Sequence, residues 1–92
     1  MTGAAGRPAP SLDGNERKLL YRCRRGTREL DRILSGFFKT CYRRLDATDR
    51  DQFSRLLELE DSLLTDWLCH GARPVDPGFE RIVGRILKST ES

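Results

Sequence analysis

The stretch from Arg24 to Asp31, RRGTRELD, gathers three arginines and two acids around one glycine, Gly26. Arginine carries a planar fork of N–H donors that suits carboxylates, phosphates and backbone carbonyls. Helix ends explain part of this charge, because arginines suit a helix C-terminus, Glu29 suits an N-terminus and Gly26 suits a C-terminal cap. They do not explain why so many arginines gather at one turn. The stretch therefore indicates a surface that recognises polar groups on another molecule.

The cysteines and the histidine are the other groups that could do chemistry. Cys23, Cys41 and Cys69 are odd in number and widely spaced, so neither a disulfide framework nor a zinc site is predicted. One histidine, His70, cannot anchor a metal site by itself, and no carboxylate pair or Ser/His/Asp set accompanies it. The sequence therefore predicts no catalytic residue, no metal site and no enzyme activity.

Length and composition are typical of one small soluble domain. The chain has 92 residues, of which 37% are hydrophobic and 34% are charged, and no apolar run approaches the ~18 residues that span a bilayer. Residues 1–14 are rich in Gly, Ala and Pro and predict a disordered N-terminal tail that lacks the apolar core of a signal peptide. We expect a cytoplasmic protein with a single helical domain over residues 15–92 and no membrane insertion.

Five segments must position these groups, and in each of them apolar side chains recur at the spacing of an α-helix. The segments cover about residues 15–24, 27–45, 48–57, 61–71 and 76–87. Thr27, Thr48 and Asp76 are predicted N-caps, and Gly26 is a predicted left-handed C-cap. Short connections between amphipathic helices predict an all-α fold, a compact bundle of five short antiparallel helices.

The apolar stripes are predicted to meet in one shared core, which supplies most of the folding free energy. Trp67 belongs to the predicted stripe of the fourth helix together with Leu63, Leu64 and Leu68. Cys41 lies on the apolar face of the second helix, as expected of a small buried hydrophobe. The pattern leaves Phe38 either buried or half-exposed.

Charge is unevenly distributed along the helices. Residues 15–44 hold ten Lys/Arg and three Asp/Glu, a net charge of +7, whereas residues 45–66 hold two and seven, a net charge of −5. Such asymmetry either steers the protein to a partner or keeps a small domain soluble, and both interpretations stay open. Lys18, Arg22 and Arg25 are spaced by four and three residues and are predicted to share one outward face of the first helix.

The arginine-rich turn also resembles a known family. The pattern R-G-x-x-E at residues 25–29, followed by Leu30 and Asp31, is similar to the signature of the succinate dehydrogenase assembly factors that promote covalent flavinylation, the SdhE type. Further matches are the paired aromatics at 37–38, the segment 53–58 and the Trp-Leu pair at 67–68. Together they extend the resemblance over about residues 15–89, nearly the whole predicted domain.

The resemblance implies a small chaperone rather than an enzyme. Such proteins bind the flavoprotein subunit of succinate dehydrogenase, and in some bacteria that of fumarate reductase. They favour formation of the bond between a histidine of that subunit and FAD. We therefore expect a monomer that binds no FAD stably and acts on FAD attachment in its client.

The expected partner-binding site follows from the motif and from the predicted helix face. It comprises Arg25, Gly26 and Glu29 from the motif, Asp31 beside it, and Lys18 and Arg22 from the shared face. The hypothesis is that Arg25 and Glu29 make paired polar contacts with the client near its flavin site. Gly26 would let the two backbones approach closely, because a Cβ there would intrude.

Two other classes of function are open. An antitoxin-like regulatory protein-interaction module would bind a partner unrelated to flavoproteins, which a pull-down from cell extract would reveal. Nucleic-acid binding could use the arginines around Gly26, and the net charge of +3 permits it. The acidic middle of the chain would repel a polyanion, however, and no recognition helix rich in Asn, Gln or Arg follows the turn. We therefore expect no nucleic-acid partner.

Overall fold

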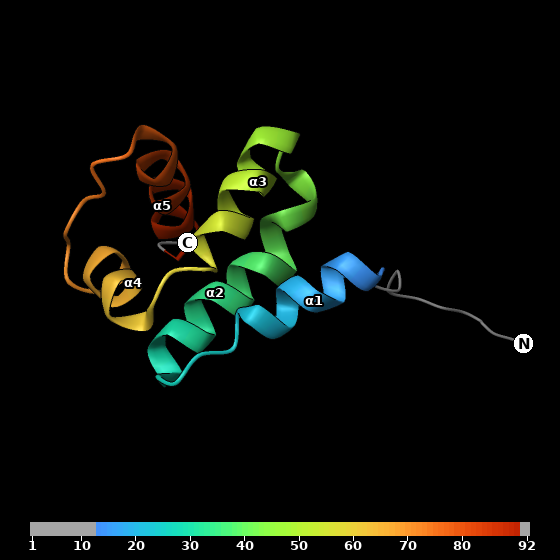
Figure 1. The fold of residues 1–92 in the computed structure, drawn as a ribbon, viewed down its shortest axis with the longest axis horizontal. Coiled ribbons are helices and arrows are strands. Elements are labelled where there is room, and N and C mark those ends of the chain that lie inside the picture. The colour runs from blue at the N-terminus through green and yellow to red at the C-terminus, as the bar shows by residue number, and fades with distance from the viewer. Residues whose placement is uncertain (1–12, 91–92) are drawn as a thin grey trace, which may run out of the picture.

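The computed structural model describes residues 13–90, and every regular element within that range is helical (Figure 1). The elements are α1 (Gly14–Arg22), α2 (Arg28–Cys41), the 3₁₀ turn η1 (Tyr42–Arg44), α3 (Ala47–Leu56), α4 (Asp61–Leu68) and α5 (Pro77–Thr90). The predicted all-α fold of five short helices is confirmed, and the antiparallel order of neighbouring helices stays a prediction. None of the described helices is both long enough and apolar enough to cross a membrane.

The predicted tail, residues 1–14, lies outside the described residues except for its last two. Asp13 and Gly14 open α1, one residue before the predicted start. The Asp13 carboxylate accepts a hydrogen bond from the backbone N–H of Glu16 at 2.7 Å, and the Glu16 carboxylate accepts one from the backbone N–H of Asp13 at 3.1 Å. This reciprocal capping box satisfies two N–H groups at the start of the helix.

Two predicted N-caps are confirmed by their hydrogen bonds. Thr27 Oγ1 accepts a hydrogen bond from the backbone N–H of Leu30 at 3.3 Å at the start of α2. Asp76 Oδ1 accepts hydrogen bonds from the backbone N–H groups of Gly78 and Phe79, at 2.8 and 3.1 Å, at the start of α5. In both places a short polar side chain replaces the carbonyl that the first helical turn lacks.

The third predicted cap, Thr48, is wrong. The helix α3 begins at Ala47 because Asp46, in an extended conformation, accepts a hydrogen bond from the backbone N–H of Asp49 at 2.8 Å. Aspartate is a somewhat better N-cap than threonine. With Asp46 in that role, Thr48 falls inside the first turn.

The C-cap predicted at Gly26 is also wrong. The helix α1 ends at Arg22, two residues before the predicted end, and its C-cap is Cys23 in a right-handed conformation. The backbone N–H of Cys23 donates to the carbonyl of Leu19 at 3.1 Å and so completes the last turn. Gly26 lies beyond that point and does not adopt a positive φ.

Gly71 is the glycine with a left-handed backbone among the described residues, with φ of 82°. It follows α4, which ends at Leu68, and it lies where the sequence predicts the helix to stop. The backbone N–H of Ala72 donates to the carbonyl of Asp66 at 2.9 Å. This bond and the left-handed residue before it form the helix end that glycine favours.

The helix α2 stops sooner than the helical pattern predicts. That pattern runs to Leu45, but the α-helix ends at Cys41, and η1 follows as a single 3₁₀ turn. The backbone N–H of Leu45 donates to the carbonyl of Tyr42 at 3.1 Å, which closes the tighter turn. Tyr42 and Leu45 are both buried, so the change of helix type keeps their apolar contacts with the core.

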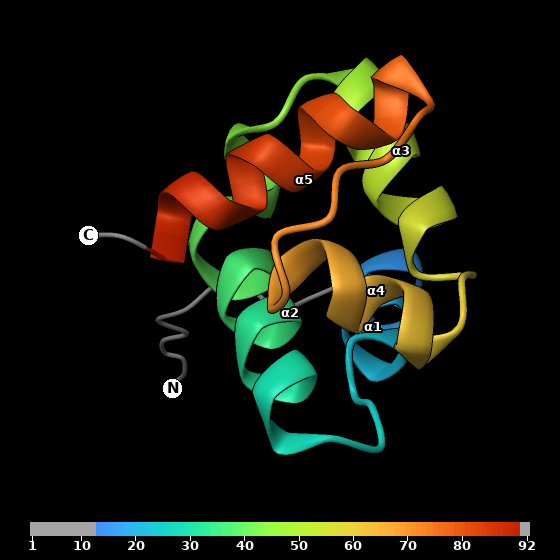
Figure 2. The same cartoon turned by 90° about the vertical axis from the view of Figure 1, so that its left-hand side faces the viewer.

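The core is one cluster to which all five helices contribute. Four aromatic rings form its centre, with neighbouring ring centroids 4.8 to 6.5 Å apart. The rings belong to Phe37, Phe38, Tyr42 and Phe53, and all four residues are buried. Phe38, whose burial the sequence pattern leaves open, is therefore a core residue. The helix α5 packs against α2, α3 and α4 and covers this cluster (Figure 2).

Three apolar residues at the edge of the core test the predicted stripes. Trp67 is 9% exposed and its ring lies 5.7 Å from that of Phe79, as expected for a core residue. Leu63 is 36% exposed, so its predicted place in the stripe is wrong. Successive helical residues point about 100° apart, and Leu64 is the one that faces the core. Cys41 is half-buried at the edge of the core rather than fully buried.

A buried ion pair fastens α3 to α5. The Asp49 side chain is 2% exposed, and its Oδ1 and Oδ2 lie 3.1 Å from Arg81 Nε and 3.6 Å from Arg85 Nε. A buried carboxylate needs such partners because its desolvation costs several kcal/mol. Nothing in the local sequence distinguishes Asp49 from its exposed neighbour Asp51, and sequence analysis misses it.

The helix α1 is tied to the rest of the fold by two apolar side chains and one ion pair. Leu19 and Cys23 are buried in the core. Arg43, in η1, donates from Nε and Nη2 to the two carboxylate oxygens of Glu16, at 3.2 and 3.0 Å. A bidentate pair of this kind fixes orientation as well as distance.

Candidate partner-binding site

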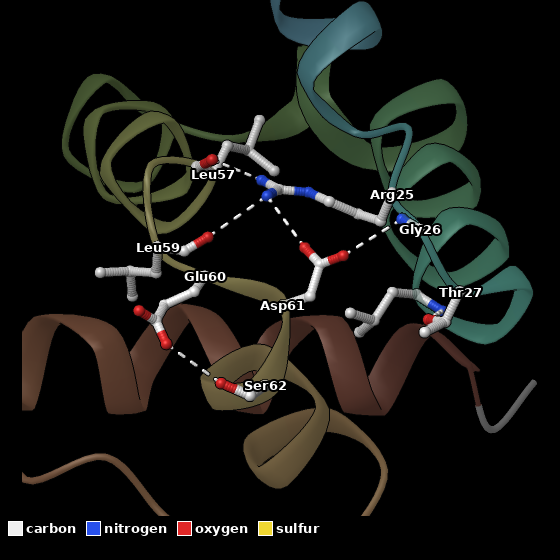
Figure 3. A network of polar contacts seen from close by, with 9 residues as sticks. Arg25, Gly26, Thr27, Leu57, Leu59, Glu60, Asp61 and Ser62 are labelled. Atoms are coloured by element: carbon white, nitrogen blue, oxygen red, sulfur yellow. Dashed lines mark hydrogen bonds and ion pairs between the residues drawn. The ribbon is translucent and has the colours of Figure 1, made fainter.

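The connection between α1 and α2 carries most of the predicted motif, and Figure 3 shows that Arg25 points from it toward the connection between α3 and α4. The Arg25 side chain is 13% exposed. Its Nη1 donates to the carbonyl of Leu59 at 3.2 Å, and its Nη2 donates to the carbonyl of Leu57. One guanidinium fork therefore satisfies two carbonyls of an irregular segment.

Asp61, the first residue of α4, binds both Arg25 and Gly26. Its Oδ1 lies 3.3 Å from Arg25 Nη1, and its Oδ2 accepts a hydrogen bond from the backbone N–H of Gly26 at 3.1 Å. We call Arg25, Gly26, Leu57, Leu59 and Asp61 the Arg25 network. Its contacts join residues between 32 and 36 positions apart in the sequence. The motif turn is therefore held in place by the start of α4 and the segment before it.

The prediction that Lys18, Arg22 and Arg25 share one outward face is wrong for Arg25. The helix α1 ends at Arg22, so the helical spacing does not continue to Arg25. Lys18 and Arg22 are exposed on α1, and neither lies within ion-pair distance of an acid in residues 13–90. These two cations face solvent, whereas Arg25 is engaged inside the fold.

Gly26 is exposed, and the fold does not require a glycine there. Its φ is not in the left-handed region. A Cβ at this position would meet Asp61 Oδ2 at 3.5 Å, an ordinary van der Waals contact. The fold therefore does not explain the absence of a side chain at Gly26.

Glu29 lies in the first turn of α2, where the helix dipole favours an acid. Its side chain is 55% exposed, and it pairs with Arg32 Nη2 at 2.9 Å rather than with Arg25. Asp31 is half-buried, and its Oδ1 lies 3.5 Å from the hydroxyl of Ser35. Glu29 and Asp31 are thus on α2, while Arg25 belongs to the network that holds the turn before it.

Two of the described thiols, Cys23 and Cys69, are weak nucleophiles at neutral pH. Burial raises the pKa of the Cys23 thiol to about 12, although nearby Arg25 opposes this shift. Burial also raises the pKa of Cys69. Within residues 13–90, no group of three or more His, Cys, Asp or Glu side chains is placed to hold a metal ion. What the site offers is recognition by carboxylates, arginines and exposed backbone.

Comparison with known proteins identifies the family. The profile of a family described as "Flavinator of succinate dehydrogenase" matches residues 17–90. The chain belongs to this family. Three curated relatives of it are each named FAD assembly factor SdhE. The Methylococcus capsulatus protein is 39% identical over 69 residues, which are 75% of this chain and 83% of that protein.

Two more relatives of the flavinator family are similar over comparable lengths. The Pseudomonas aeruginosa protein is 41% identical over 76 residues, covering 82% of this chain and 90% of that protein. The Serratia sp. protein is 38% identical over 72 residues, covering 78% and 82%. The resemblance inferred from the sequence is therefore confirmed. The family match runs from α1 to the end of α5 and includes every residue of the Arg25 network.

Sequence analysis of this flavinator family member misses the role of Asp61. It places Asp61 only at the start of the fourth helix. An acid at one helix start and an excess of arginine at a distant turn are visible in the sequence, but nothing local pairs them. The carbonyls of Leu57 and Leu59 carry no sequence signal at all, because every residue has a carbonyl.

Proposed function

We propose that this protein is an assembly factor that binds the flavoprotein subunit of succinate dehydrogenase, or of fumarate reductase, and promotes covalent attachment of FAD to that subunit. The observation that carries the proposal is the family match over residues 17–90. Relatives named FAD assembly factor support the same role. The exposed motif residues supply a surface for the client.

The contact surface in this proposal is centred on Gly26 and Glu29. Both are exposed, at the turn before α2 and in its first helical turn. Glu29 offers acceptors to the client, and Gly26 lets a second backbone approach because it has no Cβ. Lys18 and Arg22 on α1 contribute positive charge at one side of the surface, and Asp31 contributes an acid on α2.

Arg25 acts in this proposal as a positioning residue. Its guanidinium is occupied by the carbonyls of Leu57 and Leu59 and by Asp61. These bonds fix the turn that presents Gly26. Loss of Arg25 would therefore weaken client binding by releasing the turn, rather than by removing a direct contact.

The protein positions its client and makes no covalent bond of its own. Holding reacting groups in a productive arrangement lowers a barrier without a catalytic side chain. The bond between the client's histidine and FAD forms within the client, and this chain holds no FAD stably. We further propose that the protein works as a single copy in the cytoplasm and takes no nucleic-acid partner.

A reconstitution tests the proposal. The unflavinylated flavoprotein subunit is mixed with FAD, with and without this protein, and covalent flavin is read by in-gel fluorescence after denaturation. We expect faster labelling with the protein and slower labelling with Glu29→Ala. The matched control is Glu80→Ala, because Glu80 is also an exposed acid in the first turn of a helix and pairs with Arg73 at 3.4 Å.

The results of this experiment test the assembly role and the proposed contact surface separately. No acceleration by the folded wild-type protein overturns the assembly role, and the pull-down for an unrelated partner becomes the next experiment. Acceleration that Glu29→Ala and Glu80→Ala reduce equally keeps the role but removes Glu29 from the contact surface. Circular dichroism of each variant shows whether its helices are intact.

A further inference from the structure

A groove of about 690 Å³ lies beside the motif, between the end of α1 and the exposed side of α2. Its charged lining consists of Arg24, Arg28, Arg32 and Lys39 together with the acids Glu29 and Asp31. Arg28, Arg32 and Lys39 are four and seven residues apart, so they line one stripe of α2. The groove is continuous with the proposed contact surface, because Glu29 belongs to both.

The positive charge of the groove is largely unneutralised. Arg32 pairs with Glu29 at 2.9 Å. In the part of the chain that the structure describes, no acid lies within ion-pair distance of Arg24, Arg28 or Lys39. Of the two acids that line the groove, Asp31 is the one that has no cationic partner among the described residues. Three cations therefore face one acid in a concave surface.

Folding accounts for only part of this charge, because Lys39 suits the last turn of α2, where the helix dipole favours a cation. Arg28 is the first residue of α2, where the positive end of the helix dipole disfavours a cation. Arg24 lies beyond the end of α1 and is exposed, so it supports no helix of its own. The cost of gathering these cations is offset if an anionic partner neutralises them.

We propose that this groove binds an extended acidic peptide segment of the protein's partner. Arginine guanidinium groups bind carboxylates through paired, charge-assisted hydrogen bonds. The stretch from Arg28 to Lys39 spans about 16 Å at the rise of an α-helix, the length of about five extended residues. Leu20, half-buried in the groove, adds an apolar contact for the peptide.

The mixed lining favours a peptide over a nucleic acid. Glu29 and Asp31 would repel a continuous phosphate backbone, whereas they can accept hydrogen bonds from the N–H groups of a peptide. The segment 45–66, with a net charge of −5, would oppose any longer polyanion that extends beyond the groove. A short acidic peptide can place its carboxylates against the cations and its backbone N–H groups against Glu29 and Asp31, and it ends before the acidic segment 45–66.

The proposed function supplies the identity of the partner, but the groove can be tested without it. The probe is an acetylated and amidated peptide of five glutamates, titrated into ¹⁵N-labelled protein and followed by amide chemical shifts. We expect saturable shifts along residues 24–39, and a loss of affinity of about tenfold or more in the double variant Arg28→Glu/Lys39→Glu. Arg44→Glu/Lys88→Glu, which changes two exposed cations outside the groove by the same charge, should bind like the wild type.

The opposite results overturn the groove proposal. The proposal fails if the peptide causes no saturable shifts, or if its shifts are spread evenly over all basic residues. It also fails if the two double variants weaken peptide binding equally, or if a five-nucleotide oligothymidylate binds more tightly than the peptide. The same variants are then titrated against the unflavinylated flavoprotein subunit. If the wild type binds the peptide but not the subunit, the proposed function fails and the groove stands. If the subunit binds wild type and groove variant equally, an acidic segment of that client is not the occupant, and the proposal fails for this partner.

Discussion

Asp61 Oδ2 accepts a hydrogen bond from the backbone N–H of Gly26 at 3.1 Å, so the first residue of α4 holds the turn that leads into α2. The second oxygen of the same carboxylate faces Arg25 at 3.3 Å. A single side chain thus binds two consecutive residues of the motif. The shape of the motif surface therefore depends on a residue outside the motif.

Asp61→Ala tests this dependence. Removal of the carboxylate leaves the Arg25 guanidinium, 13% exposed, without its counter-charge, and we expect a loss of about 1–3 kcal/mol in the free energy of unfolding. Urea denaturation measures it. The control Asp51→Ala breaks an exposed pair with Arg55 and should cost less than about 0.5 kcal/mol. Equal losses in the two variants would show that Asp61 adds no more stability than an exposed ion pair.

Gly26→Ala should fold as the wild type does, because its Cβ would meet Asp61 Oδ2 at an ordinary 3.5 Å. A bulkier Gly26→Leu should also keep its helices while acceleration of client flavinylation is lost. Gly71→Ala is the contrast, since its φ of 82° makes a side chain cost about 1–2 kcal/mol. Thermal unfolding and the labelling assay together separate the two glycines. A Gly26→Ala protein that is unfolded would assign Gly26 a structural role.

The buried carboxylate of Asp49 should make its arginine partners matter more than other surface arginines. Arg81→Ala/Arg85→Ala removes both ion pairs of that carboxylate, and we expect a loss of about 1–3 kcal/mol. The matched double variant Arg55→Ala/Arg73→Ala removes two arginines from exposed pairs and should cost about 1 kcal/mol or less. Urea denaturation compares them, and similar losses would contradict a special role for Asp49.

The ion pair between Glu16 and Arg43 should make stability depend on pH. The hydrogen bond from Arg43, with that from the Asp13 backbone, holds the pKa of Glu16 below its ordinary value of 4.5. A carboxyl with a lowered folded-state pKa stabilises the fold fully above the ordinary value and loses this effect as pH falls through the folded one. The Tm difference between wild type and Glu16→Gln should therefore shrink as pH falls below 4.5. A constant difference between pH 6 and pH 3 would contradict it.

Patterns that repeat along the chain predict this fold well. The apolar stripe of the second predicted helix places Phe37 and Tyr42 in the core but leaves open the burial of Phe38, which the structure shows to be buried. The caps at Thr27 and Asp76 follow from short polar side chains before such stripes. These features are local, because a helix face and a helix start depend on neighbours within a few residues. The cap predicted at Thr48 is wrong because Asp46, two residues earlier, is also a competent cap.

The sequence pattern does not predict contacts between residues that are far apart in the chain. Arg25 has the same local signature whether it faces solvent or the carbonyls of Leu57 and Leu59. Gly26 and Glu29 of the motif are exposed, whereas the predicted contact with a client stays a prediction. Pairing Arg25 with Asp61 requires the fold, since 36 positions separate them.

The Arg25 network closes a loop of chain that contains α2 and α3. A nascent chain that has emerged only through α2 therefore contains the sequence of the motif but lacks the contacts that hold its turn in place. The contacts that hold the turn require the segment before α4 and its first residue, which follow α2 and α3 in the chain. If the client binds this turn as proposed, an incomplete copy that lacks α4 would be a poor competitor for it.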